Sequence, residues 1–233
     1  MTNKILIIPD VHGRTFWKYA IDNIDKYDKV IFLGDYLDPY FWEVISFDFA
    51  ISNFKEIIKF KRDNMDKVIL LKGNHDWHYI SLQFMDCSRL NYRKRSEMNQ
   101  LFQDNSDLFQ TIHIEKNFIF SHAAIHQEWL DKYDISIYDL KSQNFSTNFL
   151  EDISSWRGGF DDVGSCVWAD INESQRHKLI DGYYQIVGHT QLESAPYITK
   201  NIACLDVRRP FSLNLETNSI LDIDTNTEHK IYD

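Results

Sequence analysis

Short runs of apolar residues recur along the chain, and each run stops at polar residues or at a glycine. Runs rich in Ile, Val and Leu occupy residues 4–8, 29–33, 68–71, 117–120 and 185–187. Continuous apolar runs of this length are typical of strands that are buried on both faces. The pattern therefore predicts five strands inside the fold.

Helical spacing of apolar residues lies between the early runs. It covers residues 45–61, behind the candidate N-cap Ser46, and a similar pattern covers residues 15–24. Strand–helix–strand alternation implies right-handed crossovers, and it favours a mostly parallel inner sheet. The first third of the chain therefore predicts an α/β arrangement.

The pattern changes after Thr111. Two short runs lie close together around residues 115–117, which predicts a hairpin, and residues 201–224 read as several short strands. Residues 134–160 are polar and without a clear period, so we expect an insertion or a cap near the site there. Together the patterns predict a layered α/β or α+β sandwich in one domain that covers residues 1–233.

Composition narrows the class of protein. A chain of 233 residues with 43% hydrophobic and 15% aromatic residues can bury a substantial core, which argues against global disorder. The formal net charge of -10 disfavours bulk binding to duplex DNA, because an acidic surface repels phosphates.

Cysteine usage and the N-terminal sequence bear on the compartment. Cys87, Cys166 and Cys204 show no C-x-x-C spacing, so we expect neither a disulfide framework nor a structural zinc site. The apolar run that ends before Pro9 is too short for a membrane span. We expect a cytoplasmic protein without a membrane partner.

Metal-binding residue types follow one apolar run after another. The sequences around these run ends are ILIIPDVHG, VIFLGDYLD, VILLKGNHD, FIFSHAA and QIVGHT. They place Asp10 and His12, Asp35 and Asp38, Asn74 and His75, His122, and His189 just after the runs. Ligands in open α/β sheets bind at the carboxyl ends of strands, so these residues are expected to point at one site.

Asp, Asn and His side chains together suit divalent first-row metals such as Mn, Fe or Zn. Six ligands exceed the needs of one tetrahedral zinc, and they suit two metals that share a carboxylate. For any one of these residues a turn or cap role is the commoner explanation. The ordered set D-x-H-G, G-D-x-x-D, G-N-H-D, S-H-A and G-H-T is much more specific.

That ordered set resembles the calcineurin-like metallophosphoesterase superfamily over about residues 5–206. The single His of GHTQ is similar to its phosphoprotein phosphatase and diadenosine tetraphosphatase branch. The resemblance implies a two-sheet β-sandwich flanked by helices. It also implies that Asp10 and His12 bind one metal, that Asn74, His122 and His189 bind the other, and that Asp35 bridges them. His75 and Asp38 match the family's proton-donor pair.

One position departs from the branch. Pro39 stands in GDYLDPYF where the branch has an arginine that grips phosphate. Arg14, Arg157 and Arg208 are candidate substitutes, although for each of them a solvated surface position is the commoner explanation. The basic segment 89–95, RLNYRKR, could grip polyphosphate or single-stranded nucleic acid, or it could be a solvated face.

The expected activity is hydrolysis of phosphate esters by a hydroxide that bridges two divalent metals, with Mn²⁺ as the first choice and Fe or Zn as alternatives. His75, oriented by Asp38, would protonate the leaving group. The substrate would be a phosphorylated small molecule, a nucleotide or a phosphoprotein. The alternatives are a dinucleoside polyphosphate hydrolase, a nucleic-acid-end hydrolase, or a non-catalytic scaffold with the same fold.

Overall fold

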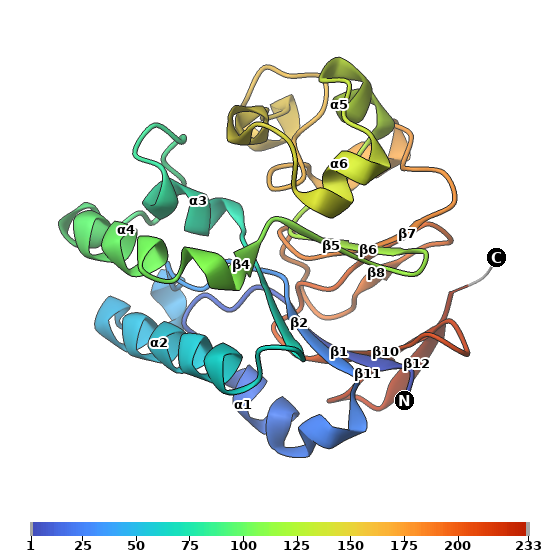
Figure 1. Cartoon of the computed structure of the whole chain (residues 1–233), viewed down its shortest axis with the longest axis horizontal. Helices are drawn as coiled ribbons and strands as arrows, with labels where there is room; N and C mark the ends of the chain where they lie inside the picture. Colours follow the sequence, from blue (N-terminus) through green and yellow to red (C-terminus); the bar gives the residue numbers. More distant parts are fainter. Residues whose placement is uncertain (1, 232–233) are drawn as a thin grey trace. The chain divides into compact units, whose positions relative to one another are not determined.

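The computed structural model describes residues 2–231, and the chain divides into two compact units. Within the described residues, the first unit consists of 2–109 and 208–231, and the second of 110–207. Each unit contains one mixed β-sheet with helices (Figure 1).

The first unit is built on a seven-stranded sheet of order β12-β11-β10-β1-β2-β3-β4. Its strands are β1 (Lys4–Ile8), β2 (Lys29–Phe32), β3 (Val68–Leu71), β4 (Phe109–Gln110), β10 (Phe211–Asn214), β11 (Ser219–Asp222) and β12 (Thr227–Lys230). β1, β2 and β3 pair in parallel, whereas β10, β11 and β12 add to β1 in antiparallel fashion. The predicted parallel inner strands are therefore confirmed.

Helices of the first unit connect these strands. They are α1 (Phe16–Ala20), η1 (Ile21–Lys26), η2 (Phe41–Glu43), α2 (Phe47–Asp63), α3 (Asn74–Ile80), η3 (Tyr92–Lys94), α4 (Arg95–Gln103) and η4 (Ser106–Leu108). The hydroxyl of Ser46 accepts a hydrogen bond from the backbone N–H of Phe49 at 3.1 Å, which confirms it as the N-cap of α2. α2 buries Phe54 and Ile57 in the core of this unit, together with Phe32 of β2.

The second unit is built on a five-stranded sheet of order β5-β6-β7-β9-β8. Its strands are β5 (Ile112–Glu115), β6 (Phe118–Ser121), β7 (Tyr184–Val187), β8 (Tyr197–Ile198) and β9 (Ile202–Cys204). β5 and β6 form the predicted antiparallel hairpin, and β6, β7 and β9 run parallel. The helices are α5 (Gln127–Lys132), α6 (Ile137–Ser142), η5 (Thr147–Glu151), η6 (Ser155–Arg157) and η7 (Ile171–Gln175).

Several sequence-based predictions can be checked against these elements. All five predicted buried strands exist, but they are divided between the two sheets. β1, β2 and β3 lie in the seven-stranded sheet, and β6 and β7 lie in the five-stranded sheet. Residues 134–160, expected as an insertion or cap, form α6, η5 and η6 within the second unit. Cys87, Cys166 and Cys204 are buried, and their thiols are free.

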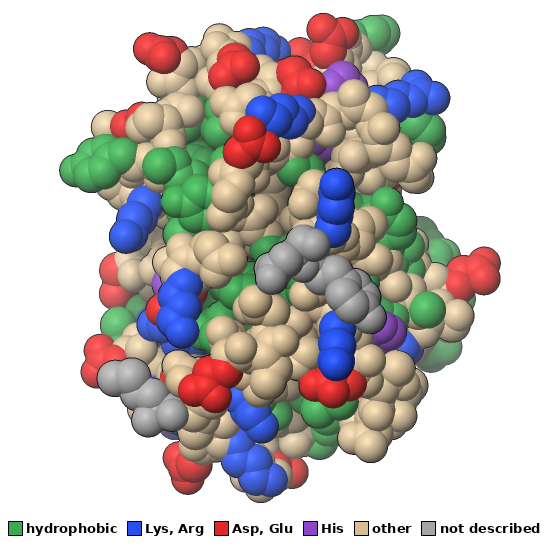
Figure 2. All heavy atoms as spheres, turned by 90° about the vertical axis from the view of Figure 1, so that its right-hand side faces the viewer, with side chains coloured by type: hydrophobic (Ala, Val, Ile, Leu, Met, Phe, Trp, Pro, Cys, Tyr) green, Lys and Arg blue, Asp and Glu red, His purple; other side chains and the backbone are tan. Residues whose placement is uncertain are grey.

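The helices and the surface charge of the described residues bear on possible membrane and nucleic-acid partners. None of their helices combines the length and the apolar character that crossing a bilayer would require. On the face drawn in Figure 2, acidic and basic side chains are interspersed, and the described residues there form no extended basic patch.

Candidate metal and catalytic site

The loops after β1 and β2 bring three predicted metal ligands together in the first unit. Carboxylate oxygens of Asp10 and Asp35 lie within 4.8 Å of each other. Nε2 of His12 lies 3.4 Å from Oδ2 of Asp35, and all three residues are buried. The backbone N–H of His12 also donates to the carbonyl oxygen of Asp35 at 2.7 Å, so the two loops are joined directly.

The protonation of His12 makes this group suitable for a cation. Its Nδ1 lies 2.8 Å from the carbonyl oxygen of Leu37, which can only accept, so Nδ1 carries the proton. Burial, followed by the charges around it, holds the pKa of His12 well below its ordinary value, so the ring is neutral. A lone pair on Nε2 therefore faces a carboxylate oxygen. Two acceptors facing each other in a buried site fit a bound cation.

Left-handed backbone conformations mark the same loops. His12, Asp35 and Asp38 have φ values of 43°, 51° and 57°, and His189 in the second unit has 65°. Non-glycine residues seldom adopt this conformation, and such strain concentrates at functional sites. Gly34 has φ 109°, and a Cβ on it would lie 2.5 Å from the backbone nitrogen of Gly73. A glycine is therefore required where the loop after β2 meets the loop after β3.

Asp76 ties these two loops together. Its buried carboxylate accepts hydrogen bonds from the backbone N–H groups of Asp35 (2.8 Å), Tyr36 (3.0 Å) and Gly73 (2.8 Å). The N–H of His75 donates in turn to Oδ1 of Asp35 at 3.0 Å. Asp35 is thus held beside the start of α3, where Asn74 and His75 lie.

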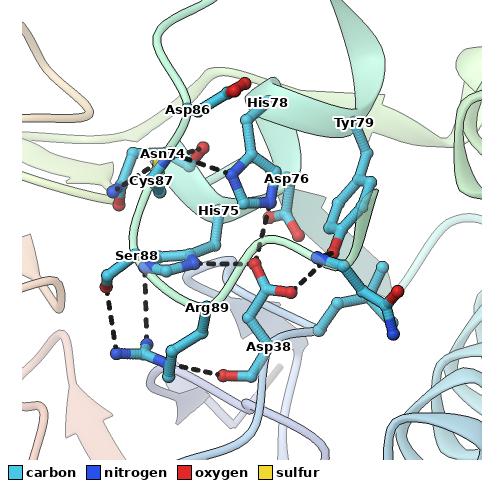
Figure 3. A network of polar contacts seen from close by, with 12 residues as sticks. Asp38, Asn74, His75, Asp76, His78, Tyr79, Asp86, Cys87, Ser88 and Arg89 are labelled. Carbon is cyan, nitrogen blue, oxygen red and sulfur yellow. Dashed lines mark hydrogen bonds and ion pairs between the residues drawn. The ribbon is translucent and has the colours of Figure 1, made fainter. Parts of the chain in front are cut away.

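His75 and Asp38 form a buried pair in the first unit (Figure 3). Nδ1 of His75 donates to Oδ2 of Asp38 at 2.8 Å, which leaves Nε2 as the ring nitrogen that can face a substrate. Burial lowers the pKa of His75 to about 4, although the carboxylate of Asp38 opposes the shift. An acid role therefore requires that His75 gain a proton when an anionic substrate binds.

Two further side chains of α3 hold Asp38. The hydroxyl of Tyr79 donates to its Oδ1 at 2.6 Å, and Nε2 of His78 lies 2.8 Å from its Oδ2. Burial raises the pKa of Asp38, but the contacts with His75 and His78 outweigh it, so the pKa lies below its ordinary value. The carboxylate therefore stays charged and keeps the His75 ring in one orientation.

Arg89 is half-buried and contacts both members of this pair. Its Nε donates to the backbone carbonyl of Asp38 at 3.0 Å, and its Nη2 lies 3.4 Å from Nε2 of His75. Its guanidinium stacks over the ring of Tyr40, 3.9 Å from the ring centre. A planar cation next to Nε2 of His75 is well placed to hold a phosphate.

In the second unit, His122 and His189 face each other. Nε2 of His122 lies 3.2 Å from Nδ1 of His189, and both residues are buried. Nε2 of His189 lies 3.2 Å from the carbonyl oxygen of Trp168, so that nitrogen carries the proton and Nδ1 presents a lone pair to His122. This pair of imidazoles suits a transition metal.

A sequence comparison decides the family of the chain. The sequence model described as calcineurin-like phosphoesterase matches residues 3–192. The chain belongs to the calcineurin-like phosphoesterase family. Enzymes of this family use divalent metals, which agrees with the ligand types found in each unit.

Solved structures show the same fold. A cold-active protein-tyrosine phosphatase of a psychrophilic Shewanella species aligns with a TM-score of 0.63 at 15% identity, over 98% of this chain and 80% of that one. A protein serine/threonine phosphatase of Saccharomyces cerevisiae aligns with a TM-score of 0.53 at 12% identity, over 99% and 80% of the two chains. No curated protein matches the sequence.

The three arginines expected to substitute at Pro39 lie in different surroundings. Nε of Arg14 donates to both carboxylate oxygens of Glu43 at 2.9 and 3.0 Å, and its Nη1 donates to the carbonyl of Asp10 at 3.2 Å. Arg157 pairs with Asp170 at 2.9 Å and donates to the hydroxyl of Thr190, next to His189. Arg208 is half-buried, and its backbone adopts the left-handed conformation with φ 63°.

Sequence reasoning gave no role to two residues of this calcineurin-like phosphoesterase, and for a third it gave only a general one. His78 and Tyr79 come three and four residues after His75, which places them on its face of α3, so helical spacing could have found them. Arg89 belongs to the basic segment 89–95, but only the fold brings it to His75.

His75, His78 and Cys87 also offer three potential metal-binding atoms within 4.8 Å of one another. The nitrogens that face inward are already engaged, since His75 Nδ1 and His78 Nε2 both lie 2.8 Å from Asp38. Burial raises the pKa of the Cys87 thiol well above its ordinary value, which disfavours the thiolate that a metal needs. We interpret this cluster as the support of the His75–Asp38 pair.

Proposed function

We propose that this protein is a metal-dependent phosphatase that hydrolyses phosphate monoesters. In this proposal Asp10, His12, Asp35 and Asn74 of the first unit and His122 and His189 of the second bind two divalent metals, with Mn²⁺ the first choice. Asp35 would be the carboxylate shared by both metals. The family match and the ligand types support this assignment.

The metal part of the proposal rests on the same feature in each unit, namely a histidine lone pair that faces a second potential metal ligand. In the first unit, the lone pair of His12 Nε2 faces Asp35 Oδ2 at 3.4 Å. In the second unit, the lone pair of His189 Nδ1 faces His122 Nε2 at 3.2 Å. Divalent metals bound by such groups would acidify a water and attract the phosphate.

The remaining chemistry belongs to the protein itself. Asp38 orients His75 through Nδ1, so that Nε2 can give a proton to the departing oxygen of the ester. The guanidinium of Arg89 lies beside Nε2 and would bind the phosphate, the task for which Pro39 provides no side chain.

The contacts that fix the orientation of His75 indicate which leaving group the ester carries. Three buried side chains, namely His75, His78 and Tyr79, converge on the Asp38 carboxylate. A positioned proton donor contributes most when the leaving group is a strongly basic alkoxide, and little when it is a weakly basic one. We infer that the leaving group is an alcohol rather than a phosphoryl group.

Hydrolysis of p-nitrophenyl phosphate before and after metal removal tests the proposal. We expect chelation followed by dialysis to abolish activity, and Mn²⁺ to restore it better than Ca²⁺, which prefers more oxygen ligands and longer bonds. Full activity in excess chelator would contradict the metal centre. No hydrolysis at any metal concentration would favour a non-catalytic binding protein.

A further inference from the structure

A pocket of about 540 Å³ opens beside the catalytic pair in the first unit. It is lined by two segments, the loop that follows Asp38 and the basic segment that begins at Arg89: Pro39, Tyr40, Phe41, Ile45, Phe47, Arg89, Leu90, Asn91, Tyr92 and Arg93. Its volume is within the range of roughly 300–1,000 Å³ that is usual for small-molecule sites.

The orientation of His75 places this pocket on the leaving-group side. Nδ1 of His75 is bound to Asp38, so a proton can reach the substrate only from Nε2. Nε2 lies 3.4 Å from Nη2 of Arg89, and Arg89 lines the pocket. An oxygen that takes its proton from Nε2 would therefore lie beside Arg89, and the rest of the leaving group could extend into the pocket that Arg89 lines.

The walls of the pocket suit a flat aromatic group. Tyr40, Phe41, Phe47 and Tyr92 contribute rings, and Phe41 and Tyr92 remain 86% and 69% exposed. Exposed rings at a binding site are platforms for stacking, as in proteins that bind unpaired bases. The side chain of Asn91 offers both a donor and an acceptor to the edge of a base.

The charge of the pocket suits an anion. Neither Arg89 nor Arg93 forms an ion pair with a carboxylate among residues 2–231, whereas the neighbouring Lys94 and Arg95 are paired with Glu97 and Asp86. Two unneutralised guanidiniums stand out in a chain with a net charge of -10. Arg93 is exposed, four residues beyond the arginine that faces His75, and can meet a second phosphate.

From these features, we propose that the pocket is a nucleoside-binding subsite and that the substrate is a nucleotide whose phosphate monoester is cleaved from a ribose hydroxyl. The inference rests on the proposed phosphatase function. Water forms the new bond to phosphorus and releases one proton to the solvent, while the bond from phosphorus to the ribose oxygen breaks. That oxygen takes a proton from His75, which then regains a proton from the solvent. The products are orthophosphate and a nucleoside, or a nucleoside that keeps a second phosphate.

The test compares kcat/KM of the Mn²⁺-loaded protein for adenosine 5′-monophosphate, ribose 5-phosphate, adenosine 3′,5′-bisphosphate and a phosphotyrosyl peptide. We expect adenosine 5′-monophosphate to exceed ribose 5-phosphate by about tenfold, the order that one stacked base provides. Phe41→Ala should remove most of that preference. Val44→Ala is the matched control, because Val44 lies in the same loop, is 93% exposed and does not line the pocket.

Arg93→Gln should reduce the preference for the bisphosphate over the monophosphate by about tenfold, because it removes a charged contact to the second phosphate. Lys94→Gln is its control, since Lys94 neighbours Arg93 but does not line the pocket. Titration calorimetry with adenosine should show weaker binding to Phe41→Ala than to Val44→Ala, independently of turnover.

Three results would overturn the inference. Equal kcat/KM for adenosine 5′-monophosphate and ribose 5-phosphate would leave the phosphatase function standing but remove the nucleoside subsite. A preference for the phosphotyrosyl peptide that is lost in Phe41→Ala would assign the pocket to a peptide. No hydrolysis of these substrates or of p-nitrophenyl phosphate would reject the phosphatase function, and the inference with it.

Discussion

Oδ2 of Asp38 lies 2.8 Å from Nδ1 of His75, although the two residues are 37 positions apart in the chain. The contact fixes which ring nitrogen of His75 can reach a substrate. His75 comes from α3 and Asp38 from the loop after β2, so their meeting depends on the parallel pairing of β2 and β3. The proposed phosphatase function depends on this pair, and the predictions below test it first.

His75→Ala should have an effect that depends on the leaving group. We expect kcat for alkyl phosphates to fall about 10²–10⁴-fold, the usual contribution of a general acid. An aryl phosphate such as p-nitrophenyl phosphate should lose much less, because its leaving group needs little protonation. Equal losses on the two substrate types would mean that His75 only positions the substrate.

Asp35→Asn and Asp38→Asn should separate metal binding from orientation. Asp35→Asn removes the charge proposed to hold two cations close together, so metal occupancy should fall, together with kcat. Asp38→Asn should keep the metal and reduce kcat through His75. Elemental analysis beside kcat measures both effects, and the assignment is reversed if Asp38→Asn loses metal while Asp35→Asn keeps it.

Asp76→Ala should destabilise the first unit more than an ordinary surface substitution. It leaves the buried N–H groups of Asp35, Tyr36 and Gly73 without their acceptor, at about 1–3 kcal/mol for each unsatisfied group. Urea unfolding measures the loss. The free energy of unfolding of Asp76→Asn, which keeps one acceptor oxygen, should lie between those of the natural protein and of Asp76→Ala. A change below about 0.5 kcal/mol, typical of surface sites, would show that the loops do not depend on Asp76.

His126 should make the free energy of unfolding depend on pH. Burial, together with the charge of nearby His177, lowers its pKa from 6.5 to about 4 in the folded protein. Between these values the unfolded chain binds more protons, so the stabilising contribution is complete above pH 6.5 and is lost as the pH falls towards 4.

The loss in that window should approach roughly 1.4 kcal/mol per pH unit. His126→Gln cannot gain the proton, so its free energy of unfolding should fall less between pH 6.5 and 4 than that of the natural protein. Urea unfolding at several pH values compares the two. Parallel curves for the two proteins would show that His126 does not carry this dependence.

The sequence by itself determined which residue types follow the buried strands. Apolar runs located β1, β2, β3, β6 and β7, and helical spacing with the N-cap Ser46 located α2. These signals are local, because burial on both faces imposes a continuous apolar run and a helix imposes its own period. The motif order likewise indicated the family, since each motif lies within a few residues of one strand end.

Only the tertiary structure decided what surrounds the pair formed by His75 and Asp38. Arg89 comes 51 residues after Asp38, yet donates to its carbonyl, and it follows a stretch after α3 that has no regular period. The sequence also did not indicate to which sheet each strand belongs, because a buried strand has the same apolar pattern in either sheet. Strand pairing and loop paths are set by contacts between residues that are distant in the sequence. A sequence pattern reflects only residues that are close together along the chain.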